Sequence, residues 1–163
     1  MMTEMENFIQ LKKDSILRIG IKTSDGKETG EHLEFDLEDI ELPLRINQCD
    51  AMHRKNAEYL KMQFIIIDKK EDKKGKFILS WREEEKLKVL QEFYKREMEA
   101  LDMFLGEGGT AKLLNGRKPY VTMYQDINEM LEPIMPKLKV RADDIINKVK
   151  SKYSNVKEND VLE

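Results

Sequence analysis

Cysteine and histidine are scarce in this chain of 163 residues, which holds one cysteine, Cys49, and two histidines, His32 and His53. A single cysteine excludes an intramolecular disulfide and a zinc site made of several thiolates. The two histidines lie far apart and in different predicted elements. The sequence therefore predicts no metal site, and it holds no motif that would require a cofactor.

Long apolar runs and an excess of one charge are also missing. The longest apolar run, from Phe64 to Ile67, is far shorter than the roughly 20 residues of a membrane-spanning helix. Lys and Arg number 29 and Asp and Glu 32, and this balance argues against a dedicated nucleic-acid-binding protein. The acidic N-terminus is not followed by the apolar core of a signal peptide. We therefore expect a protein of the reducing cytoplasm.

Two stretches near the N-terminus alternate apolar and other residues, as half-buried strands do. The first is SILRIGIKT, residues 15–23, and the second is HLEFDL, residues 32–37. The positions on their apolar faces are Leu17, Ile19, Ile21, Leu33, Phe35 and Leu37. Turn-forming glycines lie between the two stretches, so we predict a β-hairpin over residues 15–37. An isolated hairpin is marginal in water, and its apolar face is expected to cover helices or another subunit.

Two long amphipathic helices are predicted next, over residues 43–69 and 81–105. Pro43 suits the first turn of the first helix, and Ser80 and Glu83 form a capping box that starts the second. The first apolar stripe is Ile46, Cys49, His53, Ala57, Leu60, Phe64 and Ile67. The second is Leu87, Leu90, Tyr94, Met98 (or Glu97), Leu101, Phe104 and Leu105. A short polar loop joins the two helices, so we expect an antiparallel pair.

A third helix is predicted from Tyr120 to Leu138, and Pro133 and Pro136 are expected to kink it or end it early. A fourth follows at about residues 141–153, and residues 154–163 have the composition of a flexible tail. We therefore expect a single domain over residues 1–163, of the α+β class and mainly α. Its N-terminal hairpin, residues 15–37, would pack on a bundle of three to four helices within residues 43–153.

The stretch LDMFLGEGGTAKLLNGRKP, residues 101–119, holds four glycines between two apolar runs. A phosphate-binding P-loop needs Gly-Lys-Ser/Thr after a strand, whereas this stretch has no Gly-Lys-Thr and follows a predicted helix. A structural corner fits better, in which glycines end the second helix and Thr110 caps a short helix of sequence AKLLN. The residues expected to shape this corner are Phe104, Gly106, Glu107, Gly108, Gly109, Thr110 and Gly116.

Other candidate chemistry is weak. Cys49 lies one helical turn before His53, as a nucleophile and its base would, yet no third orienting group is visible in the sequence. A buried structural thiol is the better interpretation. Asp102 lies late in its helix, and its expected partner is Lys112 or Arg117. We expect no catalytic residues and no enzymatic activity.

Methionine is unusually frequent, with ten in the chain. Methionine fills irregular gaps in cores and also serves surfaces that accommodate flexible partners. Core filling is the favoured interpretation at any single position. Several methionines near the corner and the third helix still leave room for a groove that accepts a partner helix. The candidate partner-binding residues are Met123, Tyr124, Ile127, Met130 and Leu131.

The corner also carries a family resemblance. The pattern is Leu101-Asp102-x-Phe104-x-Gly106-Glu107-Gly108-x-Thr110, then Lys112-Leu113-Leu114-x-Gly116 and an apolar helix interrupted by Pro133. This pattern resembles the tail assembly chaperones of phages and prophages of Gram-positive bacteria, in which a helix ends in Asp-x-x-Phe-Gly-Glu-Gly-Thr. The resemblance covers about residues 87–140. The chain departs from the family pattern by an inserted leucine after Phe104 and by an extra glycine before Thr110.

The resemblance implies a chaperone that binds the tape measure protein and keeps it soluble in the host cytoplasm until the tail tube polymerises around it. Such a chaperone would be absent from the finished virion. The major tail protein and a second copy of the chain are further candidate partners, and neither a membrane nor a nucleic acid is expected. Two alternatives stay open. One is a structural virion component, such as a head–tail connector or a tail terminator, and the other is a nucleotide- or nucleic-acid-binding regulator.

Overall fold

The N-terminal hairpin consists of β1, Ile16–Lys22, and β2, Glu28–Asp36, which pair in antiparallel fashion with Ile19 opposite Leu33. The computed structural model describes residues 6–11 and 15–154. Apolar side chains of both strands are buried against the helices, so the predicted hairpin and its apolar face are confirmed. β2 begins before the predicted start at residue 32 because Glu28 continues the ladder opposite Lys22, beyond a bulge in β2.

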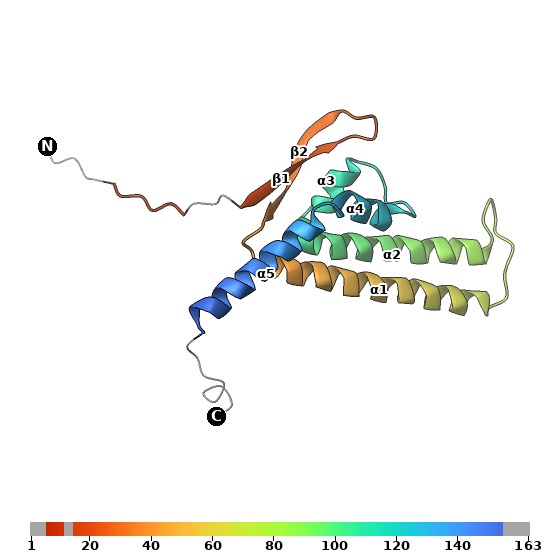
Figure 1. The fold of residues 1–163 in the computed structure, drawn as a ribbon. Coiled ribbons are helices and arrows are strands. Elements are labelled where there is room, and N and C mark those ends of the chain that lie inside the picture. The colour runs from red at the N-terminus through yellow and green to blue at the C-terminus, as the bar shows by residue number, and fades with distance from the viewer. Residues whose placement is uncertain (1–5, 12–14, 155–163) are drawn as a thin grey trace, which may run out of the picture.

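The two long helices are α1, Glu41–Asp68, and α2, Trp81–Leu105, and they run side by side in opposite directions (Figure 1). The predicted antiparallel pair is confirmed. α2 begins at the expected capping box: Ser80 Oγ accepts from Glu83 N at 3.2 Å, and Glu83 Oε1 accepts from Ser80 N at 3.1 Å. Local sequence signals of this kind place helix ends reliably because the backbone donors at a helix start need a partner whatever the tertiary context.

Three shorter helices complete the described chain: α3, Gly109–Leu114; α4, Met123–Leu131; and α5, Met135–Lys152. The predicted third helix ends at Leu131 and not at Leu138. The predicted fourth helix is the C-terminal part of α5. The prolines explain the early break, because proline has no backbone N–H to donate to the preceding turn, and Pro136 instead lies in the first turn of α5. The predicted tail at 154–163 lies, apart from Ser154, outside the described residues.

The core lies at the hairpin end of the α1–α2 pair, where α3, α4 and the start of α5 gather around it (Figure 1). Each element except α3 contributes buried apolar side chains to it. The buried apolar residues of this core are Ile21, Leu33, Phe35, Leu42, Cys49, Ala100, Leu101, Phe104, Leu105, Met123, Ile127, Leu131 and Leu138. The predicted fold class, α+β and mainly α with a hairpin packed on helices, is confirmed. The predicted corner at residues 104–116 sits at this core.

Candidate functional site

The glycine-rich corner turns the chain by backbone conformation. Gly106 ends α2, where its N–H donates to Asp102 O at 3.1 Å, and its φ of 93° lies in the region that favours glycine. At Gly109 the constraint is space, since a Cβ there would lie 2.6 Å from Leu105 Cβ. The helix AKLLN was expected to start at a Thr110 cap, and this is wrong: Gly108 holds the cap position, and Thr110 lies inside α3.

Thr110 has a different structural role at the corner. Its backbone N–H and its hydroxyl both donate to Asp102 Oδ1, at 2.8 and 2.6 Å, and the side chain is fully buried. The expected pairing of Asp102 with Lys112 or Arg117 is therefore wrong, and Lys112 instead lies 3.9 Å from Glu31 on β2. Asp102 ties the end of α2 to the start of α3, so the corner is fixed by a charge-assisted hydrogen bond.

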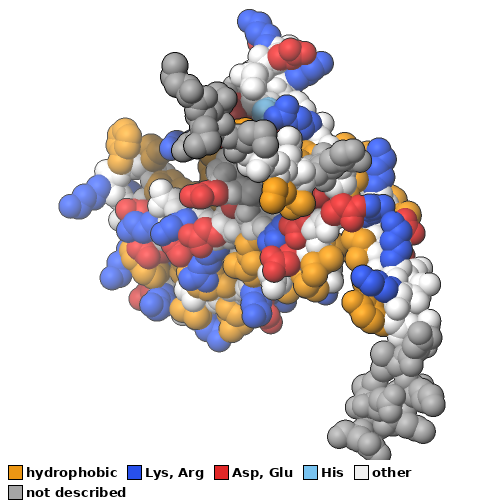
Figure 2. Space-filling model, turned by 90° about the vertical axis from the view of Figure 1, so that its left-hand side faces the viewer, with side chains coloured by type: hydrophobic (Ala, Val, Ile, Leu, Met, Phe, Trp, Pro, Cys, Tyr) orange, Lys and Arg blue, Asp and Glu red, His pale blue; other side chains and the backbone are white. Residues whose placement is uncertain are grey.

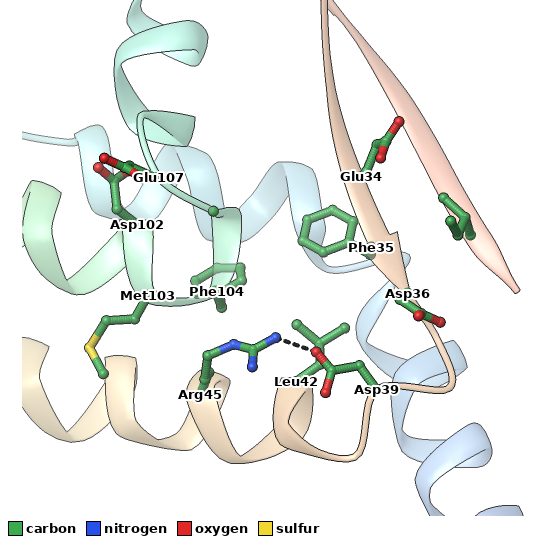
Figure 3. A pocket seen from close by; sticks show the side chains of 12 residues that line it. Glu34, Phe35, Asp36, Asp39, Leu42, Arg45, Asp102, Met103, Phe104 and Glu107 are labelled. Carbon is green, nitrogen blue, oxygen red and sulfur yellow. Dashed lines mark hydrogen bonds and ion pairs between the residues drawn. The ribbon is translucent and has the colours of Figure 1, made fainter. Parts of the chain in front are cut away.

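A hollow of about 430 Å³ lies beside the corner, between β2, the start of α1 and the end of α2 (Figure 3). Phe104, Gly106 and Glu107 of the corner line it. Its charged lining residues are Glu34, Asp36, Asp39, Asp102, Glu107 and Arg45.

Most of these carboxylates have structural partners. The Arg45 guanidinium lies 2.5 Å from Asp39 and holds the pKa of that carboxyl below its ordinary value. Ser15 donates to Asp36 at 2.9 Å, and Arg18 forms an ion pair with Glu34 at 2.7 Å. Within residues 6–11 and 15–154, no group of three or more His, Cys, Asp or Glu side chains is placed to hold a metal ion. We therefore interpret the hollow as a set of contacts that hold the hairpin.

A buried polar cluster joins α1, α2 and α4. Glu97 on α2, 1% exposed, accepts from Asn56 Nδ2 at 2.9 Å, and its other oxygen lies 2.6 Å from His53 Nδ1. The ring of Tyr124 on α4 stacks on His53, with centroids 3.5 Å apart. Burial, together with the Glu97 charge, raises the pKa of the nearby Cys49 thiol to about 11.

Cys49, His53 and Glu97 are the residue types of a nucleophile, a base and an orienting carboxylate, but the chemistry of this cluster is different. A thiol with such a pKa is protonated at neutral pH and is a poor nucleophile. The predicted interpretation of Cys49 as a buried structural thiol agrees with this environment. Sequence reasoning missed Asn56, because it placed Ala57 in the apolar stripe, and Ala57 is exposed. The spacing from Cys49 to Asn56 is seven residues, and this heptad step was the available signal.

The candidate partner-binding residues of α4 are mostly inside the molecule. Met123, Ile127 and Leu131 are 2–5% exposed and belong to the core, and Tyr124 is half-buried on His53. Met130 alone of the five is well exposed, at 57%. The prediction of a partner surface on this helix is therefore wrong for the three buried residues. The apolar face of α4 covers the end of the α1–α2 pair instead of facing outward.

An apolar groove of about 920 Å³ lies on the side of α2 that faces away from α1. α2 residues 87–98, the end of the loop before α2 and the segment 118–121 form it. We call it the α2 groove, and its apolar lining is Leu79, Leu87, Leu90, Tyr94, Met98, Pro119, Tyr120 and Val121. Its polar lining is Glu84, Lys88, Gln91, Lys95 and Lys118.

The predicted α2 stripe thus divides between two faces. Glu97 and Phe104 face the interior, whereas Leu87 is 48% exposed and Val121, across the groove, is 86% exposed. From Leu87 to Met98 the floor is roughly 16 Å long at 1.5 Å per residue, or about three helical turns. An exposed groove of this length, lined by leucines, tyrosines and a methionine, suits an apolar segment of another chain.

Comparison of the chain with protein-family models, curated proteins and solved structures finds no match in any of the three. Within the described ranges, no helix is both long enough and apolar enough to cross a bilayer.

Proposed function

We propose that the chain is a phage tail assembly chaperone, which binds an amphipathic helix of the tape measure protein in the α2 groove. Binding would keep that protein soluble in the host cytoplasm until tail assembly. The observation that carries the proposal is the groove itself, an apolar trough about three turns long on the outer face of α2. The resemblance of residues 87–140 to tail assembly chaperones supplies the identity of the client.

A client of this kind matches the groove physically. A helix that exposes an apolar stripe is prone to aggregate, and it inserts side chains at positions i, i+3, i+4 and i+7 into a complementary groove. Met98 and the exposed Leu87 give the groove an adaptable lining, which suits a long client with many similar but unequal segments. Non-covalent binding of the client helix in the groove is reversible, as a transient assembly step requires.

The rest of the surface favours solubility of the complex. Charged residues make up 37% of the chain, and cations and carboxylates are intermixed on the face shown in Figure 2, with apolar side chains between them. Mixed charges keep a small protein soluble while one apolar site is occupied. The corner residues 104–116 would act indirectly, because they hold α3 and the segment after it against α2.

Co-expression with the tape measure protein of the same genome tests the proposal. The tagged wild-type chain should retain the tape measure protein in the soluble fraction. Leu87→Glu combined with Val121→Asp places two charges in the groove at exposed positions, and should abolish retention. Ile146→Asp on α5, 51% exposed and outside the groove, is the matched control and should retain the client.

Two results would contradict the proposal. If the tagged wild-type chain does not retain the tape measure protein, and that protein is soluble by itself, the proposed chaperone function is wrong. If the chain is found in purified phage particles, the alternative of a structural virion component, such as a head–tail connector or a tail terminator, is favoured instead.

A further inference from the structure

The N-terminal arm, residues 6–11 of sequence ENFIQL, exposes large apolar side chains to water. It forms neither helix nor strand, and Phe8, Ile9 and Leu11 are 85%, 96% and 81% exposed. Apolar side chains exposed to this extent gain from burial against another surface. In Figure 1 the arm runs away from the helices, beyond the start of β1. The chain thus carries an uncovered apolar segment as well as an uncovered apolar groove.

The arm and the α2 groove agree in length. Six residues in extended conformation span roughly 20 Å at about 3.3 Å per residue. The groove floor from Leu87 to Met98 is roughly 16 Å long. Three apolar side chains of the arm can therefore be distributed along the leucine, tyrosine and methionine side chains of the floor.

The start of the arm is complementary to the groove in charge. Lys88, Lys95 and Lys118 line the groove against one carboxylate, Glu84. The acidic residues of the segment lie at its start, at Glu4 and Glu6, whereas Lys12 and Lys13 follow the arm, so only its first part is complementary to the lysines of the groove. This local excess of lysine is notable in a chain whose formal net charge is −3. Opposite charges at the rim of an apolar contact favour encounter and fix its direction.

The fold favours contact between two copies over contact within one. The arm leaves the body at the hairpin end, whereas the groove begins at Leu79, beside the α1–α2 turn at the opposite end (Figure 1). We propose that the arm of one copy docks in the α2 groove of the next, which joins copies head to tail. Such a contact is heterologous, so the copy at one end of a row still offers a free arm and the copy at the other end a free groove. Both parts belong to this chain, and the arm would occupy the groove that the proposed client uses, so the two contacts exclude each other within one groove.

Sedimentation equilibrium of the full chain over a range of concentrations tests the inference. The wild-type mass should rise with concentration beyond that of a dimer. Phe8→Asp with Ile9→Asp disables the arm, and Leu87→Glu with Val121→Asp disables the groove; each variant alone should be monomeric. All four positions are exposed, and circular dichroism spectra check that the variants fold.

A mixture of the two variants gives the sharpest result. One variant retains the groove and the other retains the arm, so the mixture should form a complex of two chains and stop there. A wild-type chain that stays monomeric, or a mixture that stays monomeric, would overturn the inference. Loss of association in Ile146→Asp, with the arm variant unaffected, would overturn it too and assign the contact to α5.

A peptide-binding assay tests the docking of the arm even if the groove variant does not fold. A fluorescent peptide of residues 2–13 should bind the full-length arm variant, measured by anisotropy. The same peptide with Phe8→Asp and Ile9→Asp should bind at least about tenfold more weakly, which corresponds to about 1.4 kcal/mol. Equal binding of the two peptides would contradict the docking. No tape measure protein is present, so failure here is separate from failure of the proposed function.

Discussion

Nδ1 of His53 on α1 lies 2.6 Å from Oε2 of Glu97 on α2, and this contact fixes two long helices through a carboxylate that is 1% exposed. Asn56 donates to the other oxygen at 2.9 Å. A buried carboxylate is tolerated because both of its oxygens are hydrogen-bonded, and removal of the carboxylate leaves His53 and Asn56 without their acceptor. Tyr124 stacks on the His53 ring, so the same cluster also holds α4 on the helix pair.

Glu97→Ala should therefore destabilise the protein strongly. The substitution leaves Asn56 and His53 without their acceptor and opens a cavity, and we expect a loss of roughly 2–4 kcal/mol of unfolding free energy. Urea unfolding followed by circular dichroism measures it. The matched control is Glu92→Ala on the same helix, whose carboxylate forms an exposed pair with Arg96, with an expected loss under about 1 kcal/mol. Equal losses in the two variants would contradict the role of the cluster.

Elements with local signals could be predicted from the sequence. The capping box at Ser80 fixes the start of α2, and alternation of apolar residues fixes the hairpin. The polar cluster could not be predicted in this way, because a stripe defined by apolar residues passes over Asn56 and treats Glu97 only as an alternative to Met98. Each of these two side chains is buried because it forms a hydrogen bond with the other across two helices. This contact belongs to the tertiary structure, and the sequence of either helix alone does not indicate it.

The position of the groove was hidden for a related reason. An apolar helix face has the same sequence pattern whether it packs on the core or lines an open surface groove. α4 carries such a face and buries it, as Met123 and Ile127 show, whereas Leu87 and Leu90 of α2 carry one and line an open groove. The packing of segments 109–121 and 123–131 after the glycine corner decides which apolar face is covered. The periodicity of apolar residues carries no information about this packing.

The Thr110–Asp102 hydrogen bond should stabilise the corner measurably. Thr110→Val keeps the side-chain shape and removes the hydroxyl that donates to Asp102 at 2.6 Å. A hydrogen bond to a charged group contributes about 1.5–3 kcal/mol, and we expect a loss in this range in urea unfolding. Thr122→Val is the matched control, since that hydroxyl donates to Asp126 at the surface, and its loss should stay within about 0.5 kcal/mol. A Thr110 variant as stable as the control would show that the backbone N–H of Thr110 suffices.

Gly109→Ala should destabilise the corner by steric overlap. The added Cβ would lie 2.6 Å from Leu105 Cβ, an atom too close to the α2 backbone to move freely. Overpacking of this kind costs about 1–3 kcal/mol, measured by thermal or urea unfolding. Gly20→Ala in β1 is the control, because nothing lies within 4 Å of its Cβ position, and it should be nearly neutral. If Gly109→Ala is also neutral, α3 can move away from α2, and the corner is less rigid than its hydrogen bonds indicate.

Stability should fall at alkaline pH through the thiol of Cys49. Burial raises its pKa in the folded chain to about 11, above the ordinary value of 9.0. Between these two pH values the unfolded chain has lost a proton that the folded chain keeps, so each rise in pH favours unfolding. The contribution is fully present below pH 9 and is lost as the pH rises toward 11.

The variant Cys49→Ala isolates this effect. It removes the ionisable group, and its stability should decline less steeply than that of the wild type in urea unfolding at pH 8, 9, 10 and 11. Tyr124, whose pKa is raised to about 12 by burial and by nearby Cys49, remains in both proteins and extends the decline above pH 10. Between pH 8 and 10 the comparison of slopes cancels the titrating groups that lie away from Cys49 and any cavity left by the missing sulfur, because the cavity lowers stability equally at each pH; above pH 10 Tyr124, whose pKa Cys49 helps to raise, contributes differently in the two proteins. Parallel slopes would mean that the thiol reaches water in the folded chain, and that the cover which α4 places over the polar cluster opens.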